Sequence, residues 1–146
     1  MILLDTNVLS ELMRPNPNPN DVVVAWVDAL PDDDVWISAI TVGEISLGLA
    51  LLPEGRRRQT LSGLAEEMFQ EEFFEKCLPF DYQAAEVYAQ IVSSRSRQGR
   101  PITVEDAQIA AIALSADLEL ATRNIKDFLG IEELKLVNPW EIDSGV

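Results

Sequence analysis

The first seven residues, MILLDTN, place the strongest constraint on how this chain can fold. Residues 2–4 form an apolar run with no polar partner, which predicts a short strand buried on both faces. The run ends at once in an acid, a hydroxyl and an amide. Because ligands bind beyond the carboxyl ends of strands in open α/β sheets, we expect Asp5 to form one wall of a site.

The rest of the chain alternates short strands with helices. This alternation predicts a three-layer α/β fold with a central, mostly parallel sheet of about five short strands flanked by helices. A length of 146 residues fits a single domain spanning 1–146. Further strands are predicted at 35–38, 78–81, 119–122 and 135–137, and helices at 8–13, 21–30, 41–52, 54–76, 82–98 and 103–114.

Two absences restrict the chemistry. The chain has no histidine, which excludes histidine-based nucleophilic and general-base catalysis and the common zinc sites. Cys77 is the only cysteine, so there is no internal disulfide and no soft-metal site, as is usual in a reducing cytoplasm. Catalysis would depend on carboxylates, hydroxyls, amides and basic residues, and the natural metals are hard ions such as Mg²⁺ or Mn²⁺.

The charge of the chain is strongly negative, at −14, which by itself argues against a nucleic-acid partner. Acids that share bound cations would weaken this objection, and so would grouping of the 11 basic residues. Two arginine groups occur, and each is equally well explained as a solvated helix face. No apolar run approaches the roughly 20 residues that span a bilayer, so we expect no membrane partner and a cytoplasmic location. The two groups are Arg56, Arg57 and Arg58, and Arg95, Arg97 and Arg100.

Three acids occupy similar positions next to the predicted strands. Asp5 follows the first strand, Glu44 begins the helix after the second, and Asp106 begins the helix before the fourth. Thr41 and Thr103 each precede their acid by three residues, so both pairs could simply be capping boxes. Asp5 could likewise cap the helix that follows it.

Convergence of these acids would need a cation. Two carboxylates about 5 Å apart repel by roughly 3 kcal/mol at an effective dielectric constant near 20. A divalent ion removes this repulsion, lowers the pKa of a bound water and holds a phosphate oxygen. The pattern therefore indicates hydrolysis of a phosphodiester. A polar region at 122–128 follows the fourth strand and would meet the acids at the same edge of the sheet.

Four motifs, in order along nearly the whole chain, resemble the PIN-domain nucleases, and most closely the VapC/FitB-like toxins of bacterial type II toxin–antitoxin pairs. The carboxyl-terminal Asn-Pro-Trp at 138–140 is also similar to that group. The motifs are MILLDTN at 1–7, SAITVGE at 38–44, DAQIAA at 106–111, and ATRN at 121–124 with Asp127 and Phe128.

The resemblance implies a Mg²⁺- or Mn²⁺-dependent endoribonuclease with a PIN-like fold. Asp5, Glu44 and Asp106 would form the catalytic triad of acids that holds the metal and activates water. The family often has a fourth acid where this chain has Asn124, which leaves a second metal open. Further residues implied to support the acids or a second metal are Thr6, Thr122, Asn124 and Asp127, and those implied to contact RNA phosphates are Arg56, Arg57, Arg58 and Arg123. The amide of Asn7 is interpreted as structural.

The resemblance also implies partners. These are an RNA substrate, a second copy of the chain in a homodimer, and a small, basic-tailed, DNA-binding antitoxin through which DNA is contacted only indirectly. Residues 8–13 and 47–52 are candidate antitoxin contacts, although most of their side chains could equally be core. Two other functions stay open. One is a catalytically weak or inactive PIN-fold binding module that acts through an antitoxin/DNA complex, which Asn124 would favour. The other is a phosphoryl-acceptor domain, and against it this chain has no second acid next to Asp5.

Overall fold

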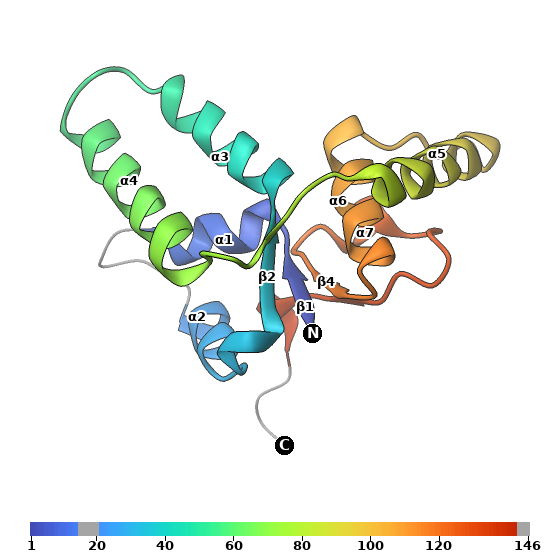
Figure 1. Cartoon of the computed structure of the whole chain (residues 1–146), viewed down its shortest axis with the longest axis horizontal. Coiled ribbons are helices and arrows are strands. Elements are labelled where there is room, and N and C mark those ends of the chain that lie inside the picture. Colours follow the sequence, from blue (N-terminus) through green and yellow to red (C-terminus); the bar gives the residue numbers. More distant parts are fainter. Residues whose placement is uncertain (15–20, 143–146) are drawn as a thin grey trace.

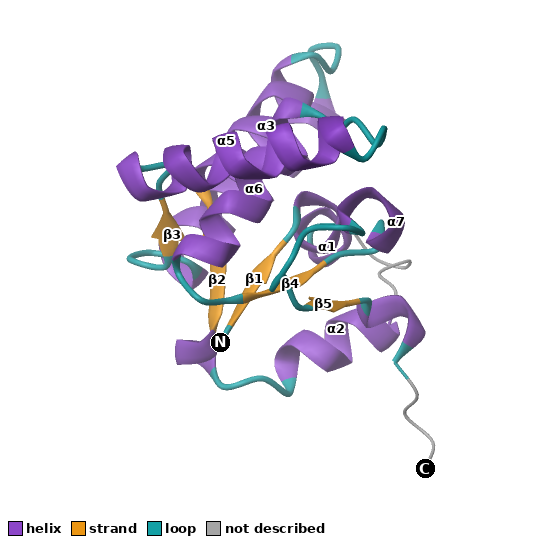
Figure 2. Ribbon diagram, turned by 90° about the vertical axis from the view of Figure 1, so that its right-hand side faces the viewer, coloured by secondary structure: helices purple, strands orange, loops and turns teal. Residues whose placement is uncertain are grey.

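A central parallel sheet organises the protein, as a computed structural model describes it over residues 1–14 and 21–142. Figure 2 shows its strands side by side in the order β3-β2-β1-β4-β5, and every neighbouring pair is parallel. The strands are β1 (Ile2–Leu4), β2 (Val35–Ser38), β3 (Cys77–Leu78), β4 (Glu119–Ala121) and β5 (Leu136–Val137). Since β1 lies between β2 and β4, its carboxyl end is the switch point where ligands bind in such sheets.

Helices cover both faces of this sheet. In Figure 1, α1 (Thr6–Leu12), α2 (Asp21–Asp28), α3 (Ala39–Ala50) and α4 (Arg56–Glu67) lie on one side of the strands. On the other side lie α5 (Tyr82–Arg97), α6 (Val104–Ser115) and α7 (Ile125–Phe128). Short turns η1 (Asp32–Asp34) and η3 (Pro139–Glu141) complete the elements, together with the π-helical η2 (Met68–Glu72). The predicted α/β fold with a five-stranded sheet is confirmed.

Strand β1 shows why the first residues are apolar without alternation. Ile2 and Leu4 pack into the core under α1 to α4, while Leu3 packs into the core under α5 and α6. Leu3 and Leu4 are both fully buried. A strand with helices on both faces needs apolar residues at every position, and this positions Asp5 at the first point where the chain leaves the core.

The predicted helix over 54–76 is wrong in its second half. The α-helix ends at Glu67, and η2 closes with a hydrogen bond from the Phe73 amide to the Met68 carbonyl (3.0 Å). Met68 and Phe73 are both buried. The wider π turn allows two apolar side chains five residues apart to reach the core together.

Several boundaries also differ from the prediction by one or more residues, and three of the differences have a local cause. The first helix begins at Thr6, directly after its cap Asp5, and α3 begins at Ala39, directly after its cap Ser38. Strand β3 occupies 77–78 instead of 78–81, because Pro79 has no amide hydrogen to continue the ladder. The predicted break at 15–20 lies outside the described residues.

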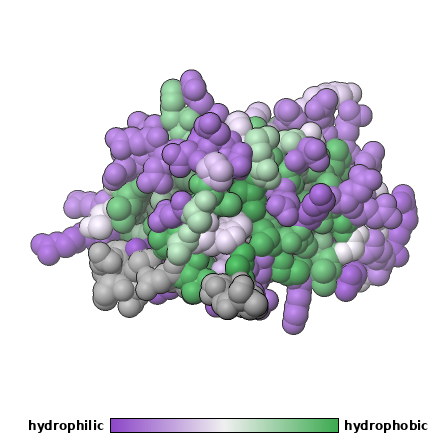
Figure 3. Space-filling model, turned by 90° about the horizontal axis from the view of Figure 1, so that it is seen from below, coloured by the Kyte–Doolittle hydropathy of each residue, from purple (hydrophilic) through white to green (hydrophobic). Residues whose placement is uncertain are grey.

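Apolar residues also reach the surface. Figure 3 views the face on which the N-terminus lies, where hydrophobic residues run across the middle and hydrophilic residues surround them. Across the two described segments, no helix is both long enough and apolar enough to cross a bilayer.

Candidate active site

Asp5 sits where β1 ends and α1 begins. Its amide donates to the Ala121 carbonyl of β4 (2.9 Å), so the backbone still belongs to the sheet edge. Its carboxylate accepts from the Thr6 amide (2.8 Å), the Thr122 hydroxyl (2.8 Å) and the Asn7 side-chain amide (3.2 Å). Asp5 is the N-cap of α1, as the simpler interpretation holds, and it also receives donors that a cap does not need.

Burial dominates the electrostatics of Asp5, which is only 4% exposed. Desolvation raises the pKa of Asp5 above its ordinary 3.8, and the donors from Thr122 and Thr6 lower it in part. The negative charge of Glu44 raises this pKa further. The hydrogen bonds thus partly offset the cost of a charged carboxylate in a closed place.

Glu44 lies in the second turn of α3 and is tied to α1 by a hydroxyl. The Thr6 hydroxyl donates to Glu44 Oε1 (2.6 Å), and its oxygen lies 3.0 Å from that of Thr41. The capping-box interpretation of Thr41 and Glu44 is wrong, because Ser38 is the cap and accepts from the Thr41 amide (3.1 Å). Extended backbone at Ser38, the last residue of β2, starts the helix earlier and moves Glu44 past the first turn.

Asp106 lies in the first turn of α6 and is half-buried. Here the cap interpretation is confirmed, because the Thr103 hydroxyl accepts from the Asp106 amide (3.2 Å). Burial, followed by the charges of Asp5, Asp127 and Glu44, raises the pKa of Asp106 from 3.8 to about 6, against a lowering contribution from Thr103. Thr103 therefore caps the turn that holds Asp106, and the pKa of Asp106 also responds to the charges of three other acids.

We call Asp5, Glu44, Asp106 and Asp127 the acid cluster. The two ion pairs seen within residues 1–14 and 21–142 join Arg14 to Glu11 and Lys76 to Asp33, so neither compensates this cluster. The negative charge of the cluster is therefore not paired with a cationic side chain among the described residues.

The donor chemistry of the acid cluster fits a hard divalent ion, since it offers only carboxylate and hydroxyl oxygens. In the described part of the chain, no three Asp, Glu or Cys side chains form a ready-made metal cage. Mg²⁺ does not require one, because it usually binds one or two carboxylates and keeps several waters. Asp5 and Asp106, whose charges interact directly, are the minimal pair for such a site.

The segment after β4 closes the site on the β4 side. The Thr122 hydroxyl, besides donating to Asp5, accepts from the Asn124 amide (3.0 Å). Asn124 precedes α7 without capping it by its side chain, and Asp127 lies within that single turn. Thr122 thus supports Asp5 by a hydrogen bond, and the charge of Asp127 acts on Asp106. Asn124 is neutral and adds no charge to the cluster.

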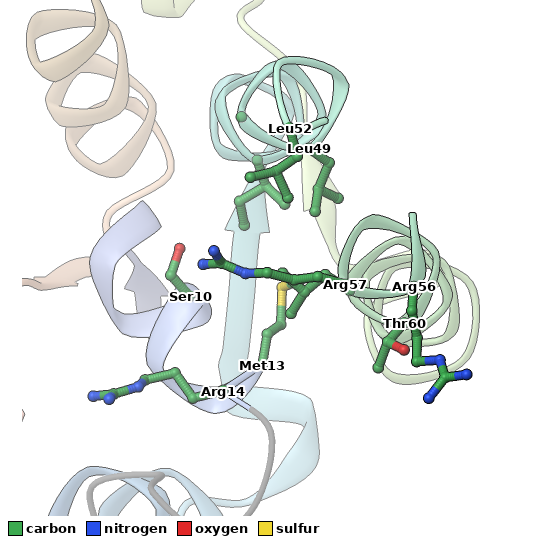
Figure 4. A pocket seen from close by; sticks show the side chains of 11 residues that line it. Ser10, Met13, Arg14, Leu49, Leu52, Arg56, Arg57 and Thr60 are labelled. Carbon is green, nitrogen blue, oxygen red and sulfur yellow. The ribbon is translucent and has the colours of Figure 1, made fainter. Parts of the chain in front are cut away.

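The predicted RNA-contacting arginines lie in two places. Arg123 follows Thr122, its amide donates to Asn7 Oδ1 (3.1 Å), and its guanidinium lies 5.1 Å from the ring centre of Trp140. The run at 56–58 begins α4, and in Figure 4 the Arg57 side chain extends across a groove toward Ser10 of α1. Only Arg123 is joined by a described hydrogen bond to a residue that contacts the acid cluster.

Three polar residues at the site were not predicted as site residues. Asn7 donates to both Asp5 and the Thr122 hydroxyl (3.3 Å), and it accepts from the Arg123 amide, so it links β1 to β4 as the structural interpretation holds. Ser38 and Thr41 are fully buried; the Thr41 hydroxyl lies beside that of Thr6, and the Ser38 hydroxyl donates to Thr41 (3.4 Å). Their signal was present: all three lie inside the motifs that carry Asp5 and Glu44.

Comparison with known proteins agrees with this fold and arrangement. The PIN domain family model matches residues 2–133. Toxin FitB of Neisseria gonorrhoeae is 44% identical over 96% of this chain and 99% of its own length. VapC ribonuclease Y4jK of Sinorhizobium fredii is 38% identical over 97% and 99%. The structure of FitAB bound to an IR36 DNA fragment includes a chain with a TM-score of 0.88 and 42% identity, fully covered in both directions.

A parallel α/β sheet with acids at its switch point places a candidate ligand site beyond the carboxyl end of β1. The chain belongs to the PIN-domain family, in the group of the FitB and VapC toxins. The resemblance drawn from the four sequence motifs is therefore confirmed.

Proposed function

We propose that this protein is a Mg²⁺- or Mn²⁺-dependent endoribonuclease, the toxin of a toxin–antitoxin pair, that hydrolyses RNA phosphodiester bonds with an activated water. The observation that carries the proposal is the acid cluster at the carboxyl end of β1. The charges of its other three members raise the pKa of Asp106, and among the described residues no cationic side chain forms an ion pair with the cluster. The ribonuclease name of the Sinorhizobium fredii relative supports the same reaction.

Asp5 and Asp106 would hold the ion, with Glu44 beside them. When bound, Mg²⁺ or Mn²⁺ supplies Lewis acidity toward a phosphate oxygen and makes a water more acidic. Asp5 is fixed in one orientation by its donors Thr6, Thr122 and Asn7. Thr6 occupies one oxygen of Glu44, and none of the described donors bonds to the other, which leaves Oε2 able to orient a water or accept its proton.

The direct test is RNA cleavage by the purified chain with Mn²⁺, with EDTA, and as Asp5→Asn. We expect cleavage with Mn²⁺ only, and a loss of at least about 100-fold in Asp5→Asn, equivalent to ~2.7 kcal/mol of transition-state stabilisation. Glu86→Gln, at an exposed acid on α5, is the matched control and should cut like wild type. Intact RNA with wild type and Mn²⁺ would favour the inactive binding module instead.

The predicted antitoxin contact falls on a groove of about 770 Å³ between α1, α3 and α4 (Figure 4). Met13, Ile45, Leu49 and Leu52 line it with apolar surface, and Arg14, Arg56 and Arg57 also line it. We infer that the antitoxin inserts a largely apolar segment here that carries acidic residues. A basic segment would suit the acid cluster instead, so the two surfaces call for opposite charges on the partner. The relative FitB is described in a complex, FitAB, bound to DNA.

Charge reversal in the groove tests this partner. Arg57→Glu should weaken binding of the antitoxin encoded by the neighbouring reading frame by about 10-fold, measured by calorimetry. Arg97→Glu, at an exposed arginine on α5, should leave binding unchanged. If Arg57→Glu weakens RNA binding and not antitoxin binding, the groove assignment fails and the predicted RNA role of Arg57 stands. The homodimer stays a prediction.

A further inference from the structure

The end of α5 holds a buried arginine with an unusual set of partners. Arg95 is only 5% exposed. Its Nε donates to the Arg100 carbonyl (2.8 Å), and its Nη1 donates to the Asp127 carbonyl (2.8 Å). A buried guanidinium is costly unless its donors are used, and here two of them reach backbone carbonyls on separate segments. The side chain therefore fastens α7 to the end of α5.

The backbone at the end of α5 is shaped to hold this side chain. Gly99 has a φ of +70°, and the helix closes with bonds from the Arg100 amide to the Arg95 carbonyl (2.9 Å) and from the Gly99 amide to the Ser96 carbonyl (3.0 Å). This glycine-dependent ending turns the chain back over the last turn of the helix. It brings the Arg100 carbonyl to Arg95 Nε.

A second contact joins the same two segments. The Gln98 side-chain amide donates to the Gly130 carbonyl (3.1 Å), two residues after α7. The side-chain oxygen of Gln98 lies 2.5 Å from where a Cβ at residue 130 would stand, and the φ of Gly130 is +84°. Glycine at 130 thus permits the close approach of α5 to the chain that leaves α7.

Helix α7 depends on such anchors, because a single turn is not stable by itself. Its leading end is fixed by the Asn124 amide on the Thr122 hydroxyl and by the Arg123 amide on Asn7. Its trailing end is fixed by Arg95 on the Asp127 carbonyl. The anchors at the leading end reach Asp5, and the anchor at the trailing end acts on Asp127 itself.

We propose that Arg95 is a positioning residue that fixes α7 so that Asp127 stands beside Asp106 in the acid cluster and takes part in metal binding. This rests on the proposed function. Asn124 contributes no charge, so Asp127 is the acid that the segment after β4 offers, and Arg95 holds the backbone of that same residue. The Asn124 amide donates to the Thr122 hydroxyl, which donates to Asp5, so the start of α7 adjoins the acid cluster. The charge of Asp127 in the same turn also raises the pKa of Asp106.

A double-mutant cycle on Mn²⁺ affinity, measured by calorimetry with the full chain, tests the proposal. The variants are Arg95→Lys, which cannot span both carbonyls with a single ammonium group, Asp127→Asn, and the two combined. Each single change should weaken Mn²⁺ binding by about 10-fold, at the low end for residues that support metal ligands. In the combined variant the losses should not multiply, because Arg95 acts through Asp127.

Arg97→Lys is the matched control, since Arg97 is exposed in the same helical turn, and it should bind Mn²⁺ like wild type. Unchanged affinity in Asp127→Asn overturns the proposal by itself, even if Arg95→Lys does not fold. Losses that multiply in the combined variant also overturn it, because Arg95 would then only support the fold. If wild type binds no Mn²⁺ and leaves RNA intact, the proposed function fails and takes the inference with it. Wild type that binds and cuts while the cycle is additive refutes the inference alone.

Discussion

The acid cluster has two halves that are built differently. The anchored half consists of Asp5 and Glu44, which accept hydrogen bonds of 2.6 to 3.2 Å from hydroxyls and amides of α1 and of Thr122, the residue after β4. The open half consists of Asp106, which is half-buried, and Asp127, which is exposed. The described side-chain contact of Asp106 is the hydrogen bond from its amide to the Thr103 cap.

The difference shows that one sheet edge can hold a carboxylate fixed by hydrogen bonds, at Asp5, next to one whose pKa depends on neighbouring charges, at Asp106. Burial is the largest cause of the raised pKa in both Asp5 and Asp106. At Asp5 two hydrogen-bond donors follow burial in size, whereas at Asp106 the charge of Asp5 follows burial. The anchored half is therefore held in place by its own hydrogen bonds, whereas in the open half the pKa of Asp106 depends on the charges around it.

Removing one donor from the anchored half should have the largest effect. Thr122→Val keeps the shape of the side chain but deletes the hydroxyl that donates to Asp5 at 2.8 Å. We expect a loss of about 1 to 3 kcal/mol in the free energy of unfolding and of about 10- to 100-fold in RNA cleavage. Urea unfolding and a cleavage assay measure the two. Thr60→Val, at an exposed position of α4, should change neither; wild-type cleavage in Thr122→Val would show that the anchor is dispensable.

The open half should give the metal-free protein a pH-dependent stability. Because the folded-state pKa of Asp106 is raised from 3.8 to about 6, the folded protein keeps this proton between these values while the unfolded chain loses it. Stability should therefore fall as the pH rises through this window, by about 1 to 2 kcal/mol after solvent screening.

Asp106→Asn tests this by removing the group. Its unfolding free energy, compared with wild type from pH 3.5 to 7.5 without divalent ions, should fall less over that window. Asp5 titrates in both proteins, so the difference between the two curves reports Asp106 together with its charge interaction with Asp5. Parallel curves would mean that Asp106 does not carry the raised pKa.

A smaller effect on metal binding is expected from adding an acid to the open half at position 124. Asn124→Asp puts an acid at the exposed position before α7. It should tighten Mn²⁺ binding by a few-fold, at a cost of about 0.5 kcal/mol to the metal-free protein from added repulsion. Calorimetry measures the first and urea unfolding the second. Weaker Mn²⁺ binding would contradict the assignment of Asn124 to the metal side of the site.

Sequence predicted the parts of this molecule that depend on local pattern. The apolar run of β1, the strand–helix alternation and the acid after β1 follow from burial on two faces and from the edge rule for parallel sheets. The caps at Asp5 and Thr103 were also recognisable, because capping uses few residue types at fixed spacing.

What sequence missed depends on contacts between distant residues. The link from Thr6 to Glu44 joins positions 38 apart, and that from Asn7 to Arg123 joins positions 116 apart. No local pattern marks a π turn at Met68 or shows that Arg57 extends across a groove while Arg123 stays beside the site. The buried Arg95 looked like one of a row of surface arginines, and only its packing against α7 distinguishes it.

The central claim is that the acid cluster binds a divalent ion through Asp5. The most direct measurement is the melting temperature of wild type and Asp5→Ala with and without Mn²⁺. At 100 times the dissociation constant, binding stabilises the folded state by about 2.7 kcal/mol, or roughly 5 to 10 °C for a chain of this size. The account predicts this rise in wild type and none in Asp5→Ala; no rise in wild type, or the same rise in both, would contradict it.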